Sequence, residues 1–261
     1  MRLGIIGKPE EESFILASKR NLSFLEFTIN QNIDVDDFMD TLPNLKKWID
    51  KYEIGIGSIG RWGTDRIDEE GNCIEAELEK SYQLIDACHE LDCPVFVCGC
   101  NYIKTLTYKK NCEGAINYFQ KLIEYGKKKN VKIATNNCRW NNFIHGPQAW
   151  QIVHMELEEL GIKYDPSHCY YSDGDYLAEI RDWGHRILHF HLKGALKIQG
   201  KRYDDPPAGM GQIDWRSVMA TLYAVGYDKG LSIEPHSQTW QGELGEKGID
   251  YTINFIRPFM L

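Results

Sequence analysis

The stretches GIKYD (161–165), RILHFH (186–191) and GLSIE (230–234) are short apolar runs that each end in a carboxylate or an imidazole. An ionisable group just past a strand, where a loop begins, more often signals chemistry than packing. Carboxylates and imidazoles that converge from the ends of successive strands are the ligands that a divalent metal needs. The spacing therefore predicts a barrel, and the residue types predict a metal site at one end of it.

Short β-rich runs alternate with amphipathic runs along the whole chain. We expect strands at 3–6, 24–28, 53–58, 95–98, 132–135, 162–165, 187–191 and 231–234. We expect helices near 10–19, 35–51, 74–91, 113–129, 147–160, 175–183, 215–225 and 246–257. Strict alternation indicates a parallel sheet. Eight such units, without Gly-x-Gly-x-x-Gly after the first strand, favour an α/β fold of the closed (β/α)₈ TIM-barrel type over a doubly wound sheet.

The 261 residues fit one barrel domain spanning 1–261. After the seventh strand, residues 194–211 are rich in Lys, Asp, Pro and Gly, and we expect them to form a long irregular loop. A loop of that length in a compact domain is usually a lid or a binding loop.

Composition excludes several classes of protein. The net charge of −8 argues against a nucleic-acid backbone as the main partner, because phosphate binding needs a basic face. No segment approaches the ~18 apolar residues of a membrane span, and the first residues lack the apolar core of a signal peptide. The eight cysteines are scattered rather than regularly spaced, so we expect reduced thiols and a cytoplasmic protein.

The ends of the last three strands carry the candidate chemistry. Asp165 and His168 are close enough in sequence to face one site, although a Pro-Ser turn capped by Asp165 would explain the same residues. His189 and His191 share one face of their strand. His191, nearer the strand end, is the better metal ligand, and His189 is a packed or hydrogen-bonded neighbour. Glu234 would be costly to bury without a metal or a cationic partner.

Over essentially its whole length the chain resembles the xylose isomerase-like TIM-barrel superfamily of sugar phosphate isomerases and epimerases. The motifs that carry the resemblance are DPSH (165–168), HFHLK (189–193), PPAGMGQIDW (206–215) and SIEPH (232–236). The resemblance implies one divalent metal ion, Mn²⁺ foremost and Zn²⁺, Co²⁺, Mg²⁺ or Fe²⁺ as alternatives. Its ligands would come from the ends of strands five to eight, which here are Asn136, Asp165, His191 and Glu234. In related epimerases the last glutamate is also the acid/base, and a histidine three after the aspartate contacts the substrate, which implies those roles for Glu234 and His168.

Two positions depart from the family pattern. Asn136 replaces the glutamate that usually ends strand five; its amide oxygen can bind a metal, but an amide cannot shuttle a proton at pH 7. Gly194 stands where many relatives have an acid. The site therefore lacks up to two negative charges, which implies a lower metal affinity or a more anionic substrate. Epimerisation by two opposed glutamates conflicts with Asn136, because that mechanism needs both as acid/base groups.

Other candidates surround the same end of the barrel. Lys193 is the loop lysine nearest the site and could hold a sugar oxygen, a carboxylate or a phosphate. Glu26 ends strand two and could hydrogen-bond a sugar, although a buried salt bridge would also explain it. Tryptophans after strands three, five and eight could stack on sugar C–H surfaces, or pack as ordinary loop residues. The expected catalytic residues are Glu234, His168 and Lys193. The expected substrate contacts are Glu26, Trp62, Asn137, Trp140, Arg202, His236 and Trp240.

These residues lead to three functional hypotheses. The first is a metal-dependent isomerase or epimerase that acts on a ketosugar or sugar phosphate by proton abstraction beside a carbonyl. The second is a lyase of the inosose dehydratase kind or one acting on 3-keto sugars, which tolerates Asn136 because elimination needs one base and one acid. The third is a barrel that binds a carbohydrate without turnover. We expect a small-molecule carbohydrate partner, neither nucleic acid nor membrane, and a homodimer or homotetramer as in many relatives.

Overall fold

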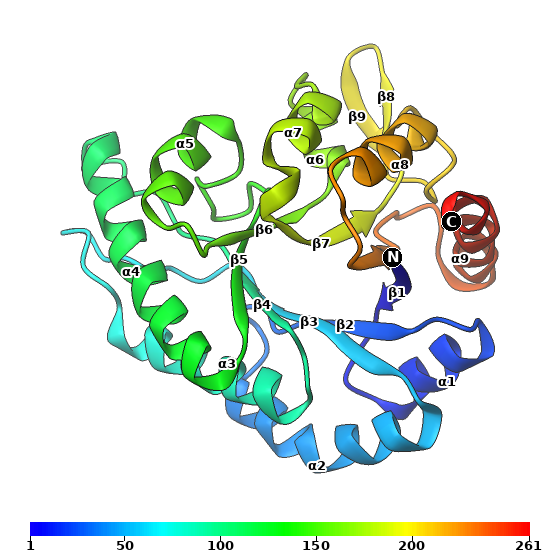
Figure 1. Ribbon diagram of the computed structural model, residues 1–261, viewed down its shortest axis with the longest axis horizontal. Coiled ribbons are helices and arrows are strands. Elements are labelled where there is room, and N and C mark those ends of the chain that lie inside the picture. Colours follow the sequence, from blue (N-terminus) through cyan, green and yellow to red (C-terminus); the bar gives the residue numbers. More distant parts are fainter.

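Eight parallel strands close into a barrel surrounded by helices in the computed structural model, which describes residues 1–261 (Figure 1). The strands are β1 (Arg2–Ile6), β2 (Phe24–Thr28), β3 (Gly55–Arg61), β4 (Val95–Cys98), β5 (Lys132–Asn136), β6 (Gly161–Tyr164), β7 (Ile187–Leu192) and β10 (Gly230–Ile233). The barrel closes because β1 pairs in parallel with both β2 and β10. The predicted (β/α)₈ barrel is confirmed.

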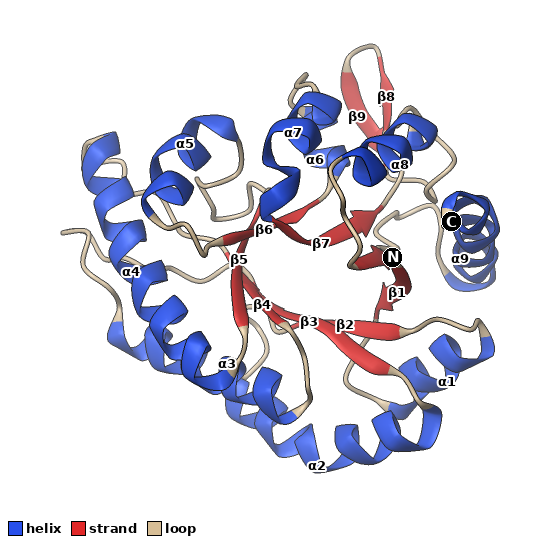
Figure 2. Cartoon of the chain, in the orientation of Figure 1, coloured by secondary structure: helices blue, strands red, loops and turns tan.

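An outer ring of helices covers the strands (Figure 2). The helices are α1 (Glu11–Lys19), α2 (Val35–Tyr52), α3 (Glu75–Glu90), α4 (Tyr108–Lys129), α5 (Pro147–Glu156), α6 (Pro166–Tyr171), α7 (Tyr176–Trp183), α8 (Trp215–Ala224) and α9 (Gly242–Ile256). Single 3₁₀ turns follow α7 and α9 at Gly184–Arg186 and Arg257–Phe259. None of the helices combines the length and apolarity needed to cross a bilayer. Arg20 joins the two ends of the ring through ion pairs with Glu246 and Asp250 of α9.

The largest hydrophobic core lies between the barrel and the helices. In β2 the buried residues Leu25 and Phe27 belong to this core, whereas Glu26 between them points to the barrel axis. Strand register then fixes which polar residues share the interior. Glu26 is level with Ser58, His191 with Ser232, and Asn136 with Lys163. The barrel interior is thus unusually polar.

Two elements differ from the sequence-based expectation. Residues 194–211 are not wholly irregular, because β8 (Leu196–Ile198) and β9 (Lys201–Asp204) form an antiparallel hairpin that projects from the barrel (Figure 1). Its two turn residues, Gln199 and Gly200, have φ values of 50° and 74°, the left-handed conformations that a tight hairpin turn requires. The short helix α6 was also not predicted. It begins where the Asp165 carboxylate accepts the backbone N–H of Ser167.

His154 on α5 links this helix to the barrel wall. Its Nδ1 lies 3.1 Å from the Leu160 carbonyl oxygen, and its Nε2 lies 2.9 Å from Thr135 Oγ1 on β5. This arrangement fits a neutral imidazole in which Nδ1–H donates to the carbonyl and Nε2 accepts the threonine hydroxyl. Burial lowers the pKa of His154 to about 4, so the folded protein keeps it neutral.

We therefore expect His154 to make stability depend on pH. The unfolded imidazole has an ordinary pKa of about 6.5. Below that pH, and down to about 4, the unfolded state binds one more proton than the folded state, so stability falls as pH falls, by up to about 1.4 kcal/mol per pH unit. Urea unfolding at pH 7 and pH 5 should show a weaker pH dependence for His154→Gln than for wild type. The control His185→Gln changes an exposed histidine and should retain the wild-type dependence. Equal pH dependence in all three proteins would contradict the assignment.

Candidate functional site

Three of the predicted ligands meet at the carboxyl end of the barrel. Asp165 directly follows β6, His191 lies near the end of β7, and Glu234 directly follows β10. One ligand atom from each of the three lies within 4.8 Å of the others. His191 Nδ1 is 3.0 Å from Glu234 Oε2. Side chains that are distant in sequence converge here because the ends of parallel strands meet at one edge of the barrel.

A lysine ammonium stands between the two carboxylates. Lys193 Nζ lies 3.0 Å from Asp165 Oδ2 and 2.9 Å from Glu234 Oε2. The lysine side chain is 2% exposed, so its charge needs these partners. Burial opposes the charged form of Lys193, but the two carboxylates outweigh burial and raise its pKa above the usual value. In this structure Lys193 therefore supplies the positive charge at the centre of the site.

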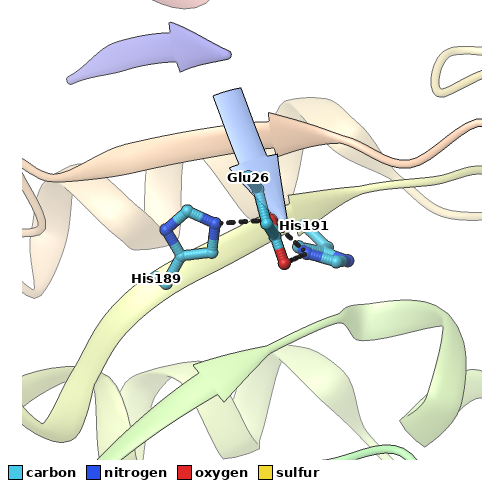
Figure 3. Close-up of side chains that lie close together, drawn as sticks. All are labelled: Glu26, His189 and His191. Carbon is cyan, nitrogen blue, oxygen red and sulfur yellow. Dashed lines mark hydrogen bonds and ion pairs between the residues drawn. The ribbon is translucent and has the colours of Figure 1, made fainter. Parts of the chain in front are cut away.

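Below this centre, Glu26 joins the two histidines of β7 (Figure 3). Its carboxylate reaches from β2 between the imidazoles, with Oε2 at 2.8 Å from both His189 Nε2 and His191 Nε2. Burial alone would raise the pKa of Glu26, yet the two imidazoles hold it well below its usual range. With Nε2 of His191 directed to Glu26, Nδ1 faces Glu234 and the site. A carboxylate behind a metal-binding imidazole fixes ring orientation and tautomer.

His168 borders the site from α6. Its Nε2 is 3.5 Å from Asp165 Oδ2, and its side chain is 18% exposed. Burial lowers the pKa of His168 to about 4, even though the Asp165 carboxylate acts in the opposite direction. The imidazole is therefore neutral at pH 7 and can donate or accept one hydrogen bond.

The two asparagines that end β5 have different surroundings. Asn136 is fully buried; its Oδ1 accepts a hydrogen bond from Asn142 at 3.3 Å, and its Nδ2 has no partner. Asn137, an expected substrate contact, uses its amide to hold the backbone of Asp165. Its Nδ2 donates to the Asp165 carbonyl at 2.8 Å, and its Oδ1 accepts the Asp165 N–H at 2.9 Å. Asn137 thus positions the aspartate in this structure.

Two predicted substrate contacts converge on an aspartate that sequence reasoning did not select. Arg202 pairs with Asp205, and His236 Nδ1 lies 3.2 Å from the same carboxylate. The Tyr171 hydroxyl donates to Asp205 at 2.7 Å. Burial would raise the pKa of Asp205, but His236 and its other partners lower it to about 2. This cluster joins the hairpin loop to the segment that follows Glu234.

The predicted tryptophans lie at different depths. Trp62 is 7% exposed and packs in the barrel interior with Val95, Val97 and Ala134. Trp240 is half-buried and lies in the segment between β10 and α9. Trp140 is 47% exposed. Only Trp140 offers an open ring face in this structure, and a substrate contact by any of the three remains a prediction.

Lys163 is the interior charge that sequence reasoning missed. It is 4% exposed and has no carboxylate within ion-pair distance, and its Nζ lies 5.3 Å from the centre of the Trp62 ring. The signal was present in GIKYD, because Lys163 lies two residues before Asp165 and therefore on the same face of the strand. The lysine was missed because the run GIKYD was interpreted as an apolar strand.

The residues present fit a divalent metal. Asp165, His191 and Glu234 offer two carboxylates and one imidazole, which suit Mn²⁺, Zn²⁺, Fe²⁺ or Co²⁺. Asp165 Oδ2 is buried and receives no hydrogen bond of normal geometry. Since Lys193 Nζ lies between the carboxylates, a metal at that point requires the lysine side chain to move.

Residues 14–259 match the sequence family described as xylose isomerase-like TIM barrel. The chain belongs to this family. A search among curated proteins found no match. With this match the predicted xylose isomerase-like resemblance is confirmed, and the catalytic roles of individual residues remain predictions.

Solved structures of similar fold include sugar epimerases. D-Psicose 3-epimerase from Clostridium cellulolyticum H10, solved with D-tagatose, is 15% identical, with 99% of both chains covered and a TM-score of 0.77. 3-Keto-D-glucoside 4-epimerase from E. coli is 14% identical, with the same coverage and TM-score. The IOLI protein, solved with a zinc atom, is 15% identical, with 99% of this chain and 98% of that chain covered and a TM-score of 0.76. At these identities the similarity establishes the fold.

We expect Glu26→Gln to weaken divalent-metal binding by about 10- to 100-fold, because the amide carries no negative charge to stabilise the imidazole and replaces one acceptor oxygen by a donor NH₂ group. Titration calorimetry of Mn²⁺ or Zn²⁺ into chelator-stripped protein measures this. Glu69→Gln, an exposed change outside the site, is the control. Unchanged metal affinity in a folded Glu26→Gln protein would show that Glu26 does not support the metal ligand.

We expect Lys193→Met to strengthen metal binding by roughly tenfold or more. The change removes the cation that competes for Asp165 and Glu234, and it leaves two buried carboxylates that need a positive charge. Lys201→Met on the exposed hairpin is the matched control. The same calorimetric titration applies. A weaker affinity in Lys193→Met than in both wild type and the control would contradict competition between lysine and metal.

Proposed function

We propose that this protein is a metal-dependent enzyme that removes a proton beside the carbonyl group of a ketosugar or sugar phosphate, and so isomerises or epimerises it. The observation that carries the proposal is the convergence of Asp165, His191 and Glu234 with Lys193 at the carboxyl end of the barrel. That face is where (β/α)₈ enzymes place their active sites.

Asp165, His191 and Glu234 would hold the metal, with the Asn136 amide oxygen as a fourth, neutral ligand. Mn²⁺ is the first choice of ion. When bound, the metal polarises the carbonyl and the neighbouring hydroxyl of the substrate, which makes the adjacent C–H more acidic.

Glu234 is the proposed base. Burial would raise its pKa, but Lys193 and His191 hold it well below its usual range, so it is ionised; displacement of Lys193 would raise its pKa and make it a stronger base. It is also 16% exposed, whereas Asp165 is fully buried, so Glu234 is the carboxylate that a substrate can reach. Neutral His168 would hydrogen-bond a substrate hydroxyl. Lys193, once displaced from the carboxylates, would orient a substrate oxygen.

Asn136 favours a second candidate function. Inversion by two opposed glutamates needs a proton acceptor at the end of β5, and there the structure has a buried amide hydrogen-bonded to Asn142. Elimination of a β-hydroxyl from a keto sugar needs one base for the C–H proton and one acid to protonate the leaving hydroxyl, and proton transfer on one face of the substrate needs only a single base; neither requires an acid/base group at position 136. A lyase of the inosose dehydratase or 3-keto-sugar kind is therefore the alternative.

Exchange of substrate protons with D₂O tests both reactions. Metal-loaded protein is incubated with a panel of ketosugars, sugar phosphates and 3-keto sugars, and NMR follows deuterium incorporation beside the carbonyl and loss of hydroxyl. Glu234→Gln should slow exchange by between about 10² and 10⁴-fold. Glu243→Gln on the exposed start of α9 should match wild type. Wild-type protein that binds metal and sugar without exchanging any proton would overturn the proposal and indicate a carbohydrate-binding barrel.

A further inference from the structure

A second cavity opens beside the proposed reaction centre. We call it the side pocket. It has a volume of about 410 Å³, is lined by the loops after β4 and β5 together with α6 and α7, and includes His168 in its wall. Its volume falls within the range typical of small-molecule sites. The proposed proton transfer uses no residue of the side pocket except His168.

One wall of the side pocket is aromatic. Phe143 packs edge-on against Tyr102 and Tyr108, with ring centroids 5.6 and 6.0 Å apart. Tyr102 is 42% exposed, so part of its ring is free to contact a ligand. Such a ring face attracts the C–H face of a sugar or the edge of another aromatic ring.

The rest of the lining includes polar side chains. Arg139, His145 and Glu179 are among them, and the Glu179 carboxylate accepts a hydrogen bond from Tyr164 at 2.7 Å. Glu179 and His145 are both half-buried. Together they present donors and acceptors to a hydroxylated ring that lies against the aromatic wall.

His168 connects the two spaces. Its Nε2 is 3.5 Å from Asp165 Oδ2, and the same residue lines the side pocket. Ala149 and Cys169, which are 3% and 6% exposed, also line the side pocket. A ring held at Asp165 and Glu234 would therefore have the side pocket as its neighbour on the far side of His168.

We propose that the side pocket is a second subsite, and that the substrate is a glycoside whose reacting sugar carries a second six-membered ring. The second ring is either another sugar or an aromatic group. This rests on the proposed function, in that the reacting sugar is taken to lie at Asp165 and Glu234. A free monosaccharide would leave the side pocket unfilled.

Binding of inert glycosides tests the subsite without turnover. Calorimetric or NMR titrations compare glucose, cellobiose and phenyl β-D-glucoside. We expect cellobiose or phenyl glucoside to bind about tenfold more tightly than glucose, since one stacking contact contributes about that much. Whichever of the two binds more tightly identifies the second ring as a sugar or an aromatic group. Equal affinity for all three ligands would overturn the subsite.

Two variants locate the contact. Tyr102→Ala should remove the tenfold preference and leave glucose affinity unchanged, whereas Tyr203→Ala, a 69% exposed tyrosine on the hairpin, should keep it. Gly146→Leu adds a side chain to the pocket lining where a Cβ meets no atom within 4 Å, and it should also remove the preference. A preference retained in both Tyr102→Ala and Gly146→Leu would place the second ring elsewhere.

The outcome is separable from that of the proton-exchange experiment. Glu234→Gln should lose proton exchange but keep the preference for the two-ring ligands, because the change leaves the side pocket intact. A protein that shows the preference without any proton exchange would refute the proposed reaction and leave the subsite standing. A protein that exchanges protons of simple ketosugars without the preference would refute the subsite alone.

Discussion

The burial of three carboxylates inside one barrel is the constraint on which the site depends. Glu26, Asp165 and Glu234 are all nearly or fully withdrawn from water, and an isolated buried carboxylate would instead take up a proton. Each is kept ionised by a specific cation or imidazole. Lys193 serves Asp165 and Glu234 together, and His191 lies between Glu234 and Glu26. Removal of Lys193 would leave Asp165 without its ammonium partner and Glu234 with only His191, so these residues are energetically coupled.

The barrel supplies the precision that such a unit needs. Parallel pairing sets Asn136 level with Lys163 and His191 level with Ser232, so positions far apart in sequence share one face of the sheet. The loop after β6 is held on both sides of Asp165, by the Asn137 amide and by the turn that its own carboxylate caps. The position of Asp165 is therefore fixed by contacts that do not involve His191 or Glu234.

The fold was predictable because its signal is repetitive. Each of the eight β-rich runs and eight amphipathic runs has its own local hydrophobic period. An error in the boundary of one element therefore does not affect the prediction of the others. The convergence of Asp165, His191 and Glu234 was predictable for a related reason, since each lies at or near the end of a recognisable strand. The hairpin at 196–204 was not predicted because Gln199-Gly200 is an uncommon turn pair. Helix α6 was not predicted because six residues are too few to show a helical period.

Contacts between side chains on opposite strands of the barrel could not be predicted from the sequence. Nothing local indicates that Glu26 meets His189, because the two are 163 residues apart and their meeting depends on barrel closure. Glu26 was expected to face a sugar or a salt bridge, and the structure shows it bonded to two imidazoles. Asp205 was missed for the same reason, since Arg202, Tyr171 and His236 reach it from three separate segments.

The net charge of the barrel interior links Asn136, at the end of β5, to the kind of molecule that the site can stabilise. Glu26, Asp165 and Glu234 contribute −3, and Lys163 with Lys193 contributes +2, which leaves −1 when the histidines are neutral. A divalent metal bound under the proposed function would bring the total to +1. A glutamate at position 136 would cancel that excess, but Asn136 does not. The net charge of +1 then attracts a substrate that is already anionic, or that becomes anionic as its proton leaves. Compared with a glutamate, Asn136 therefore weakens metal binding but strengthens the attraction of the site for a developing negative charge.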